Sequence, residues 1–410
     1  MTFREVQLQD VLDIQWGDTK TTKASYVPSG YIAYSATGPD GFLEKFDYDT
    51  DGVVLSAIGA NCGSTFYAMG KWSCIKNTIR IIPKTKEIDL KYFYYMTKAP
   101  NFWPLRGSAQ PFISQTDIRE MFVRIPEVAR QKVIGQILHD IEIMIKANTQ
   151  LSKTLEDIAQ TIFQSWFIDF GPVKAKMAGE KPVGMDAATA ALFPDSMEDS
   201  ELGLIPKGWT VEVAENIFDI SIGRTPPRKE PGWFCAGNEG VPWVSIRDMG
   251  TFNTYSNATS EGLTEEAVAK FRVPVVPEGT VLMSFKLTVG KLCISDKPLV
   301  TNEAIAHFVI SSDSVITNHF TFLWLANHDM NSLDSTSSIG TATNSGVIKQ
   351  IQFLIPDGAV LDAFSEVCAP IFKQIKSINS ENTTLVEIRD SLLPRLISGE
   401  LQIPDEMLAS

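Results

Sequence analysis

The feature that most constrains this chain is a long internal repeat. Residues 118–166 align without a gap on residues 348–396, at a constant offset of 230. Upstream the offset is 227, where residues 52–55 meet residues 279–282, and then 206, where residues 13–19 meet residues 219–225. An offset that changes only between blocks indicates a duplicated unit with insertions in its loops. The sequence therefore predicts two copies of one structural plan.

Each copy is predicted to hold a globular head followed by a long helix. Segments such as GVVLSAI and GTVLMSF are short, rich in β-branched residues and bounded by glycine, proline or asparagine, which is typical of strands. The expected fold class is α+β, with two similar mixed α/β domains separated by two long antiparallel coiled-coil-like helices and related by a pseudo-twofold internal repeat. The expected segments are a first head (1–126), a first helix (127–170), a connector (171–204), a second head (205–356), a second helix (357–400) and a tail (401–410).

Both predicted helices carry a seven-residue apolar period. In the first helix one frame holds Ile134, Ile141, Asn148, Leu155 and Ile162, and a second frame, three residues later, holds Ile137, Met144, Leu151 and Ile158. The second helix has Phe364, Ile371, Ile378, Leu385 and Leu392 in the first of these frames. Four sustained heptads indicate coiled-coil-like packing, and the single polar residue Asn148 is expected to fix its register. The alternative is a surface helix that packs only on its own head.

The end of the second helix contains a proline within its apolar stripe. Ile388, Leu392, Leu393 and Leu396 follow helical spacing, and Pro394 lies among them. Proline removes a backbone hydrogen bond, so we expect the helix to kink or end there.

Composition indicates a folded protein of more than one domain. The chain has 410 residues, of which 44% are hydrophobic and 21% charged, and this length favours two or more cores. No apolar run approaches the roughly 20 residues that span a membrane, and the N-terminal MTFREVQLQD lacks a signal-peptide pattern. Five cysteines without a CxxC pair fit neither a disulfide framework nor a zinc site. A cytoplasmic protein is expected.

Motifs of enzyme active sites are not found in the sequence. It contains no phosphate-binding GxxxxGK[ST], no HExxH, no GxSxG and no GxGxxG. Asp89 and Lys91 have the D-x-K spacing of a nuclease site, but no suitable acidic partner lies near them. Two classes of function remain open at this point. One is a non-catalytic adaptor whose twin heads bind protein, and the weaker one is a self-contained methyltransferase or nuclease.

Several segments resemble one family. TLEDIAQTIFQSWFIDFGPVKAKMAGE (residues 154–180) and GMDAATAALFPDSMEDSELGLIPKGW, which follows it, closely resemble the central conserved region of specificity (S) subunits of type I restriction–modification systems. SLLPRLISGEL (391–401) resembles the end of their distal conserved helix, and VPWVSIRDM (241–249) and TNEAIAHF (301–308) resemble parts of their target recognition domains. The resemblance covers essentially the whole chain.

This resemblance implies a role in DNA recognition. The two heads would be target recognition domains, each recognising one half of a bipartite target in double-stranded DNA. The helices would set the spacer between the halves and dock two methyltransferase (M) subunits, to which motor-nuclease (R) subunits add. The chain itself would be non-catalytic and without a cofactor. S-adenosylmethionine, ATP and magnesium would be bound by the partner subunits.

The net charge of −13 is unusual for a DNA-binding protein, but it is unevenly distributed. Residues 1–126 carry 14 Lys and Arg against 13 Asp and Glu, whereas residues 205–356 carry 11 against 15. The two helical segments and the connector therefore hold most of the negative charge. DNA affinity is expected to come from local basic patches in the heads or from the M subunits.

Loops in both heads supply the candidate DNA-binding residues. Arg and Gln side chains suit base edges in the major groove, and small hydroxyl residues suit phosphates. In the first head the candidates are Arg106, Ser108, Gln110, Ser114 and Gln115. In the second head they are Arg224, Arg228, Lys229, Lys286, Thr288, Lys291, Thr341, Thr343 and Asn344.

The candidate partner-binding residues lie at the ends of the two helices. The segment from Trp166 to Phe170 has more aromatic surface than one helix face is expected to hide, and exposed apolar patches often mark interfaces. The candidates are Trp166, Phe167, Phe170, Leu393, Pro394 and Leu396. No metal-binding residues are predicted.

Overall fold

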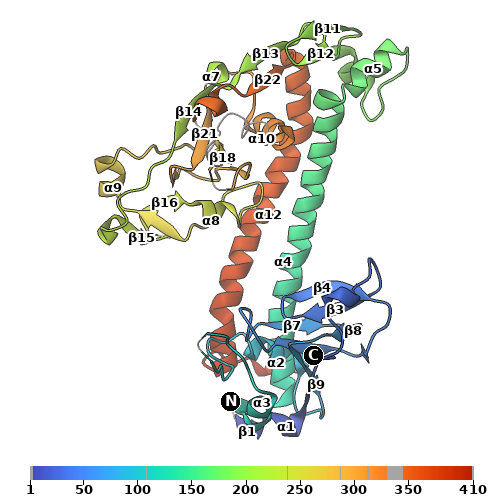
Figure 1. Ribbon diagram of the computed structural model, residues 1–410, viewed down its shortest axis with the longest axis vertical. Helices are drawn as coiled ribbons and strands as arrows, with labels where there is room; N and C mark the ends of the chain where they lie inside the picture. Colours follow the sequence, from blue (N-terminus) through green and yellow to red (C-terminus); the bar gives the residue numbers. More distant parts are fainter. Residues whose placement is uncertain are drawn as a thin grey trace. The chain divides into compact units, whose positions relative to one another are not determined.

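The chain folds into a mixed α/β structure with two long helices (Figure 1). The computed structural model describes residues 3–107, 109–237, 239–286, 288–311, 314–329 and 345–408. Within these ranges, no helix is both long enough and apolar enough to cross a membrane. The chain divides into two compact units, of which the first comprises Met1–Ala147 with Thr384–Ser410 and the second Asn148–Thr383. Each unit thus contains one head and parts of both long helices.

The first unit contains two four-stranded sheets. The first sheet has the order β2 (Leu12–Trp16), β9 (Thr78–Pro83), β6 (Gly52–Ser56) and β7 (Thr65–Ala68), with all neighbours antiparallel. The second has the order β4 (Gly38–Leu43), β3 (Tyr31–Ser35), β8 (Lys71–Cys74) and β5 (Tyr48–Asp49). A strand pair, β1 (Arg4–Gln7) with β10 (Phe122–Ile125), precedes the long helix. The shorter helices are α1 (Leu8–Val11), α2 (Leu90–Met96) and α3 (Gln115–Glu120).

The second unit repeats the strand order of the first sheet, whereas its second sheet is ordered differently. Its first sheet is β14 (Phe218–Ile222), β21 (Ile305–Ile310), β18 (Val281–Ser284) and β19 (Leu292–Ile294). Its second sheet is β15 (Phe234–Ala236), β17 (Glu261–Leu263), β16 (Val241–Val244) and β20 (Val300–Thr301). The strand pair is β13 (Thr210–Val213) with β22 (Gln352–Ile355). The helices that correspond to those of the first unit are α7 (Ala214–Ile217), α10 (Asn318–Asn327) and α11 (Ser345–Lys349).

Elements without a counterpart fill the second unit's loops and connector. In the second head these are α8 (Ile246–Met249) and α9 (Glu265–Lys270). The connector contains α5 (Gly171–Met177), α6 (Ala187–Leu192) and the hairpin of β11 (Met197–Ser200) with β12 (Gly203–Pro206).

Hydrogen bonds at corresponding positions confirm the predicted repeat. The amide of Asp18 donates to the carbonyl of Cys74 in the first unit, and the amide of Arg224 donates to the carbonyl of Thr301 in the second, each at 2.9 Å. The offsets of 206 and 227 read from the sequence relate these two pairs. The duplication therefore extends to the backbone pairing of each head.

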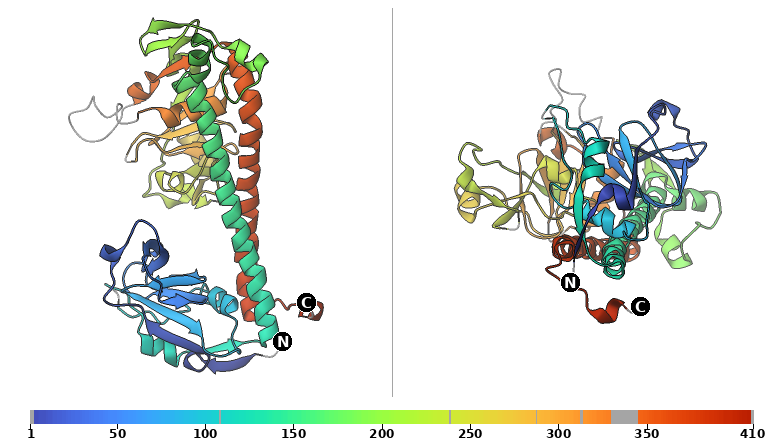
Figure 2. Two further views of the ribbon diagram at one scale, coloured as in Figure 1. Left: turned by 90° about the vertical axis from the view of Figure 1, so that its right-hand side faces the viewer. Right: turned by 90° about the horizontal axis from the view of Figure 1, so that it is seen from below.

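The long helices pair within each unit in antiparallel orientation (Figure 2). They are α4 (Val128–Phe163), extended by a π-helical turn at Gln164–Ile168, and α12 (Gly358–Ser398). In the second unit the Phe163 ring lies 5.8 Å from that of Phe364, and the Asn382 side-chain amide donates to the Thr149 hydroxyl at 3.4 Å. In the first unit Arg130 near the start of α4 donates at 2.7 Å to the carbonyl of Ile403, beyond the end of α12.

The predicted second heptad frame of α4 is wrong by one residue. Met144, Leu151 and Ile158 are 46%, 46% and 44% exposed. The buried frame lies one residue later, where Ser152 is 6% exposed and Ala159 is fully buried. Positions three and four residues after the first frame both lie beside it, so the period alone does not decide between them. Packing selects the later frame, which begins with the fully buried Leu138.

The expectation that α12 ends at Pro394 is also corrected. The helix continues through Pro394 to Ser398. Leu396 is only 2% exposed and belongs to the core of the first unit, with Leu392, Leu393 and Ile397 packed against that core. The helix ends at Gly399, whose φ of +79° is a left-handed conformation that glycine adopts without strain. Packing of the last turn therefore outweighs the single backbone hydrogen bond that proline removes.

Candidate nucleic-acid and partner interfaces

In the first head, the predicted DNA-binding loop is an ordered turn with one exposed cation. The backbone of Arg106 pairs with that of Phe112 through two hydrogen bonds of 2.9 Å. The Arg106 guanidinium forms an ion pair with Asp117 at 2.5 Å, although its side chain stays 60% exposed. Gln110 is exposed, and Ser108 lies outside the described residues. Arg106 and Gln110 thus remain available at the surface of this loop.

The other two candidates in this loop have structural partners. The Ser114 hydroxyl accepts a hydrogen bond from the amide of Thr116 and caps α3. The Gln115 side chain donates at 2.6 Å to the carbonyl of Ile14 and ties α3 to β2. Both side chains are half-buried. Their observed contacts position the loop.

A cleft of about 630 Å³ with mixed polar and apolar walls lies beside this loop in the first head. Residues 61–66, from the β6–β7 turn, and residues 97–105, which lead into the Arg106 turn, form most of its wall. Thr37 at the start of β4 completes it. The cleft therefore joins three loops of one head.

In the second head, Arg228 is held between aromatic rings and a carboxylate. Its guanidinium carbon lies 4.1 Å from the ring centroid of Phe234 and 4.7 Å from that of Trp243. It also forms an ion pair with Glu261 at 2.7 Å, and its side chain remains 50% exposed. Stacking and pairing fix the plane of the guanidinium before any ligand binds.

The remaining described candidates of the second head lie in two loops. Arg224 is exposed and donates at 3.1 Å to the carbonyl of Phe271, and Lys229 is exposed in the same basic loop. Lys286, Thr288 and Lys291 lie in the β18–β19 turn, where the Ser284 hydroxyl accepts from the amide of Lys291 at 2.9 Å. Thr341, Thr343 and Asn344 lie outside the described residues.

A buried polar layer supports the first sheet of each head. In the first head Arg80 on β9 forms an ion pair with Asp13 at 2.8 Å. At the corresponding position of the second head is His307, whose ring nitrogens lie 2.9 Å from the Ser221 hydroxyl and 2.7 Å from the Thr301 hydroxyl. Burial lowers the pKa of His307 to about 4, so the imidazole is neutral at pH 7.

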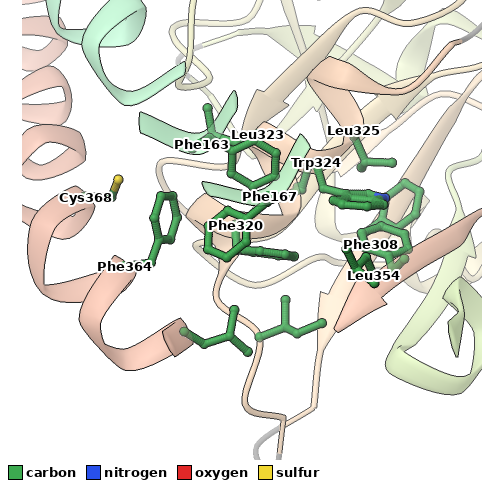
Figure 3. Close-up of a cluster of buried hydrophobic side chains, with 14 of the residues drawn as sticks. Phe163, Phe167, Phe308, Phe320, Leu323, Trp324, Leu325, Leu354, Phe364 and Cys368 are labelled. Atoms are coloured by element: carbon green, nitrogen blue, oxygen red, sulfur yellow. The ribbon is translucent and has the colours of Figure 1, made fainter. Parts of the chain in front are cut away.

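The expected exposed aromatic patch at the end of α4 is wrong. Trp166 is 6% exposed and Phe167 1%, and both belong to the core of the second unit. Figure 3 shows Phe167 in this core beside Phe320 and Phe364. The π-helical turn at Gln164–Ile168 widens the inward face of the helix, so that successive aromatic residues point into the core. Phe170 is half-buried against Trp209, with ring centroids 6.0 Å apart.

The other end of the helix pair presents a cleft in the first unit. The cleft measures about 480 Å³ and lies between α12, α4 and the end of α2. Its lining residues are Arg389, Asp390, Leu393, Pro394, Glu142, Tyr94, Tyr95, Lys98, Ala99 and Pro100. Lys98 lies in its wall and donates to the carbonyl of Thr65 at 2.6 Å, and burial lowers the pKa of Lys98 to about 8. Pro394 is exposed here, whereas Leu396 is buried beneath it.

Sequence reasoning missed two cations of the first head, Lys23 and Lys76. They line one small pocket of about 190 Å³ together with Thr37. The repeat contained the signal, because the loop after β2 corresponds to the basic loop that was selected in the second head. In the described residues, no cluster of three or more His, Cys, Asp or Glu side chains is arranged to hold a metal ion.

Comparisons with known proteins match both copies of the repeat. Residues 2–157 and 206–388 match the family described as "Type I restriction modification DNA specificity domain". The HindI type I restriction enzyme specificity subunit of Haemophilus influenzae is 27% identical over 338 residues, which cover 72% of each chain. The MjaIX specificity subunit of Methanocaldococcus jannaschii is 22% identical over 428 residues, covering 97% of this chain and 93% of the relative.

One solved structure has the same fold over nearly the whole chain. It is the S subunit of a type I restriction–modification system from M. genitalium, with a TM-score of 0.62 and 14% sequence identity. The similarity covers 97% of this chain and 96% of the other.

Proposed function

The chain belongs to the type I restriction–modification DNA specificity family, and from this premise we propose that it recognises a bipartite target in double-stranded DNA, one half with each head. The observation that carries the proposal is the duplication itself. Two heads whose first sheets have the same strand order present different loop chemistry. Arg106 and Gln110 are exposed in the first head, and Arg228 is held on aromatic rings in the second. Different loops on one scaffold suit two different half-sites.

The long helices are proposed to set the spacer and to dock two M subunits, to which R subunits add. Each copy of the repeat contributes one long helix, which is consistent with two docking sites. In the second unit Leu151 and Ile158 on α4 leave an apolar stripe about half exposed, and such stripes suit a partner helix. In the first unit the cleft that Leu393 and Pro394 line is a second candidate. These surfaces replace the buried Trp166 and Phe167 as the proposed contacts.

Catalysis is proposed to reside in the partners. The similar curated chains are named as specificity subunits, and the sequence carries none of the phosphate-loop, zinc-protease or hydrolase motifs. S-adenosylmethionine, ATP and magnesium would then be bound by M and R subunits. The role of this chain is to select the DNA site at which they act.

Methylome sequencing tests this function directly. The chain is expressed with an M subunit encoded beside it, in a host that lacks other methyltransferases, and modified adenines are mapped across the genome. We expect one motif with two defined halves and an undefined spacer, and no such motif when this chain is omitted. A contiguous motif would contradict the two-headed arrangement, and methylation that does not depend on this chain would exclude its role in specificity. An adaptor that binds only protein would give the second result.

A further inference from the structure

A loop in each head is pressed against the start of a central strand. Gly17 lies so close to the backbone of residues 74 and 75 that an added Cβ would meet their carbonyl oxygens at 2.8 and 2.7 Å. Its counterpart Gly223 lies even closer to Thr301, where a Cβ would meet the carbonyl oxygen at 2.1 Å. A side chain cannot fit at either position. The loop that follows each glycine is therefore held beside the turn that leads into β9 or β21.

In the first head this contact gathers basic and hydroxyl side chains. The pocket at the junction is lined by Thr22, Lys23, Ser35, Thr37, Lys76 and Asn77, with Ala36 and Ile75 beneath. Lys76 is exposed, and the Lys23 side chain is 58% exposed. Lysine and small hydroxyl side chains are the groups that commonly contact DNA phosphates.

Lys23 is held in place by a cluster around Asp40. Lys23 donates to Asp40 at 2.5 Å and to the Thr37 hydroxyl at 2.9 Å, and Tyr26 and Ser35 donate to the same carboxylate at 2.8 and 2.7 Å. Partial burial opposes ionisation of Asp40, but these hydrogen bonds hold its pKa well below the usual range. The carboxylate stays ionised and orients the ammonium of Lys23 beside the pocket, while Lys76 lies on its other wall.

The pocket and the larger cleft of the same head share one lining residue. Thr37 lines both the small pocket and the 630 Å³ cleft, and that cleft extends to Leu105, next to Arg106. Thr37 therefore lies between the basic junction and the cleft that leads toward the predicted base-contacting loop.

The second head has the opposite charge at the corresponding position. The offset of 227 pairs Lys76 with Glu303, and Thr225 donates a hydrogen bond to the Glu303 carboxylate. In the basic loop that follows β14, Arg228 forms an ion pair with Glu261 of β17. Each head pairs one of these cations with a carboxylate, Lys23 with Asp40 and Arg228 with Glu261. The difference lies at the next position, where the first head has the exposed Lys76 and the second has Glu303.

We propose that the pocket formed by Lys23, Thr37 and Lys76 binds phosphates of the DNA backbone, and that the first head supplies more of the non-specific DNA affinity than the second. The inference rests on the proposed DNA-binding function and deepens it. Backbone contacts release condensed counterions, so each one makes binding more salt-dependent without selecting a base. Glu303 removes such a contact from the second head.

A charge exchange between the heads tests the proposal. The chain is purified with its M subunits, and its affinity for a 40-base-pair duplex of arbitrary sequence is measured over a range of salt concentrations. We expect Lys76→Glu to weaken binding about eightfold or more near 0.1 M salt, and to lower the slope of log affinity against log salt by about one. Glu303→Lys should strengthen binding and raise the slope by a similar amount. Neither variant should change the methylated motif.

Lys86→Glu is the matched control. Lys86 is exposed and follows the other end of β9, a strand of six residues and so about 20 Å from the pocket. It should leave affinity and slope unchanged. Wild-type affinity and slope in Lys76→Glu, or weaker binding by Glu303→Lys, would overturn the proposal while the wild-type complex still binds DNA. A wild-type complex that binds no DNA would instead overturn the proposed function, and the inference with it.

Discussion

Phe167 packs edge-on against Phe364, with ring centroids 4.9 Å apart and ring planes at 84°. The contact joins the π-helical turn after α4 to the first turns of α12 inside the core of the second unit. Phe320 of α10 lies 5.1 Å from the same Phe167 ring. One aromatic side chain thus connects both long helices to the second head.

Truncation of this side chain should destabilise the second unit. We expect Phe167→Ala to lower the free energy of unfolding by about 3–5 kcal/mol, because it removes a fully buried ring and leaves a cavity. Urea denaturation followed by tryptophan fluorescence measures the change. Met177→Ala, at a residue that is 55% exposed, is the control and should have little effect. Unchanged stability in Phe167→Ala would mean that the aromatic core does not hold the unit together.

Stability of the second unit should depend on pH through His307. Its folded pKa of about 4 lies below the usual 6.5, so the unfolded chain binds more protons between these values. The stability that His307 gains by staying neutral is fully present above pH 6.5. It is lost as the pH falls from 6.5 to 4, and the total loss of unfolding free energy is about 3 kcal/mol.

Comparison with His307→Gln isolates this contribution, because the amide retains hydrogen-bonding groups for Ser221 and Thr301. Unfolding midpoints in urea are measured from pH 7 to pH 4 for both proteins. The wild type should lose more stability over this range than the variant. Parallel curves would show that His307 is not protonated on unfolding.

Specificity should separate by head. Replacing Arg106 and Gln110 with alanine should relax only one half of the target, and replacing Arg228 and Lys286 only the other. Each lost base contact is expected to cost about 1–3 kcal/mol. Methylome sequencing of each variant gives the two half-sites independently. A first-head variant that relaxes both halves equally would contradict separate recognition by the two heads.

The helix pair should act as a ruler. Heads that enter successive major grooves lie about 10 base pairs apart, so half-sites of about three or four leave a spacer of roughly six or seven. The test inserts four residues beside Thr149 in α4 and four beside Asn382 in α12. These two residues face each other, so equal insertions preserve the register of the helix pair. The pair lengthens by about 6 Å, close to two base-pair rises of about 3.4 Å.

The methylated motif should then keep both halves and gain about one or two spacer base pairs, by the same comparison of rises. Four residues inserted after Val183, which is 96% exposed in the connector, form the control and should leave the spacer unchanged. An unchanged spacer in the helix variant would show that the helices do not set the distance.

The sequence alone determined the duplication, the two long helices and the family. These features are local or periodic, so they can be read from the residues directly. The matched blocks at offsets of 230, 227 and 206 remain recognisable because both copies fold by the same backbone pairing. The offset of 227 also aligns Lys76 with Glu303, although the sequence did not indicate that either residue was a candidate for DNA binding.

Only the tertiary structure decided which side chains are buried. Both Leu151 and Ser152 lie beside the first heptad frame, and the more apolar residue is the exposed one, because the face that packs on neighbouring elements is the one that carries Leu138, Ser152 and Ala159. Pro394 stays helical and Trp166 is buried for a related reason: packing against a distant segment outweighs the local preference of a proline or an aromatic run. Lys23 and Lys76 are 53 residues apart in the chain. They share a pocket because Gly17 has no side chain, which lets its loop lie directly against the backbone of residues 74 and 75.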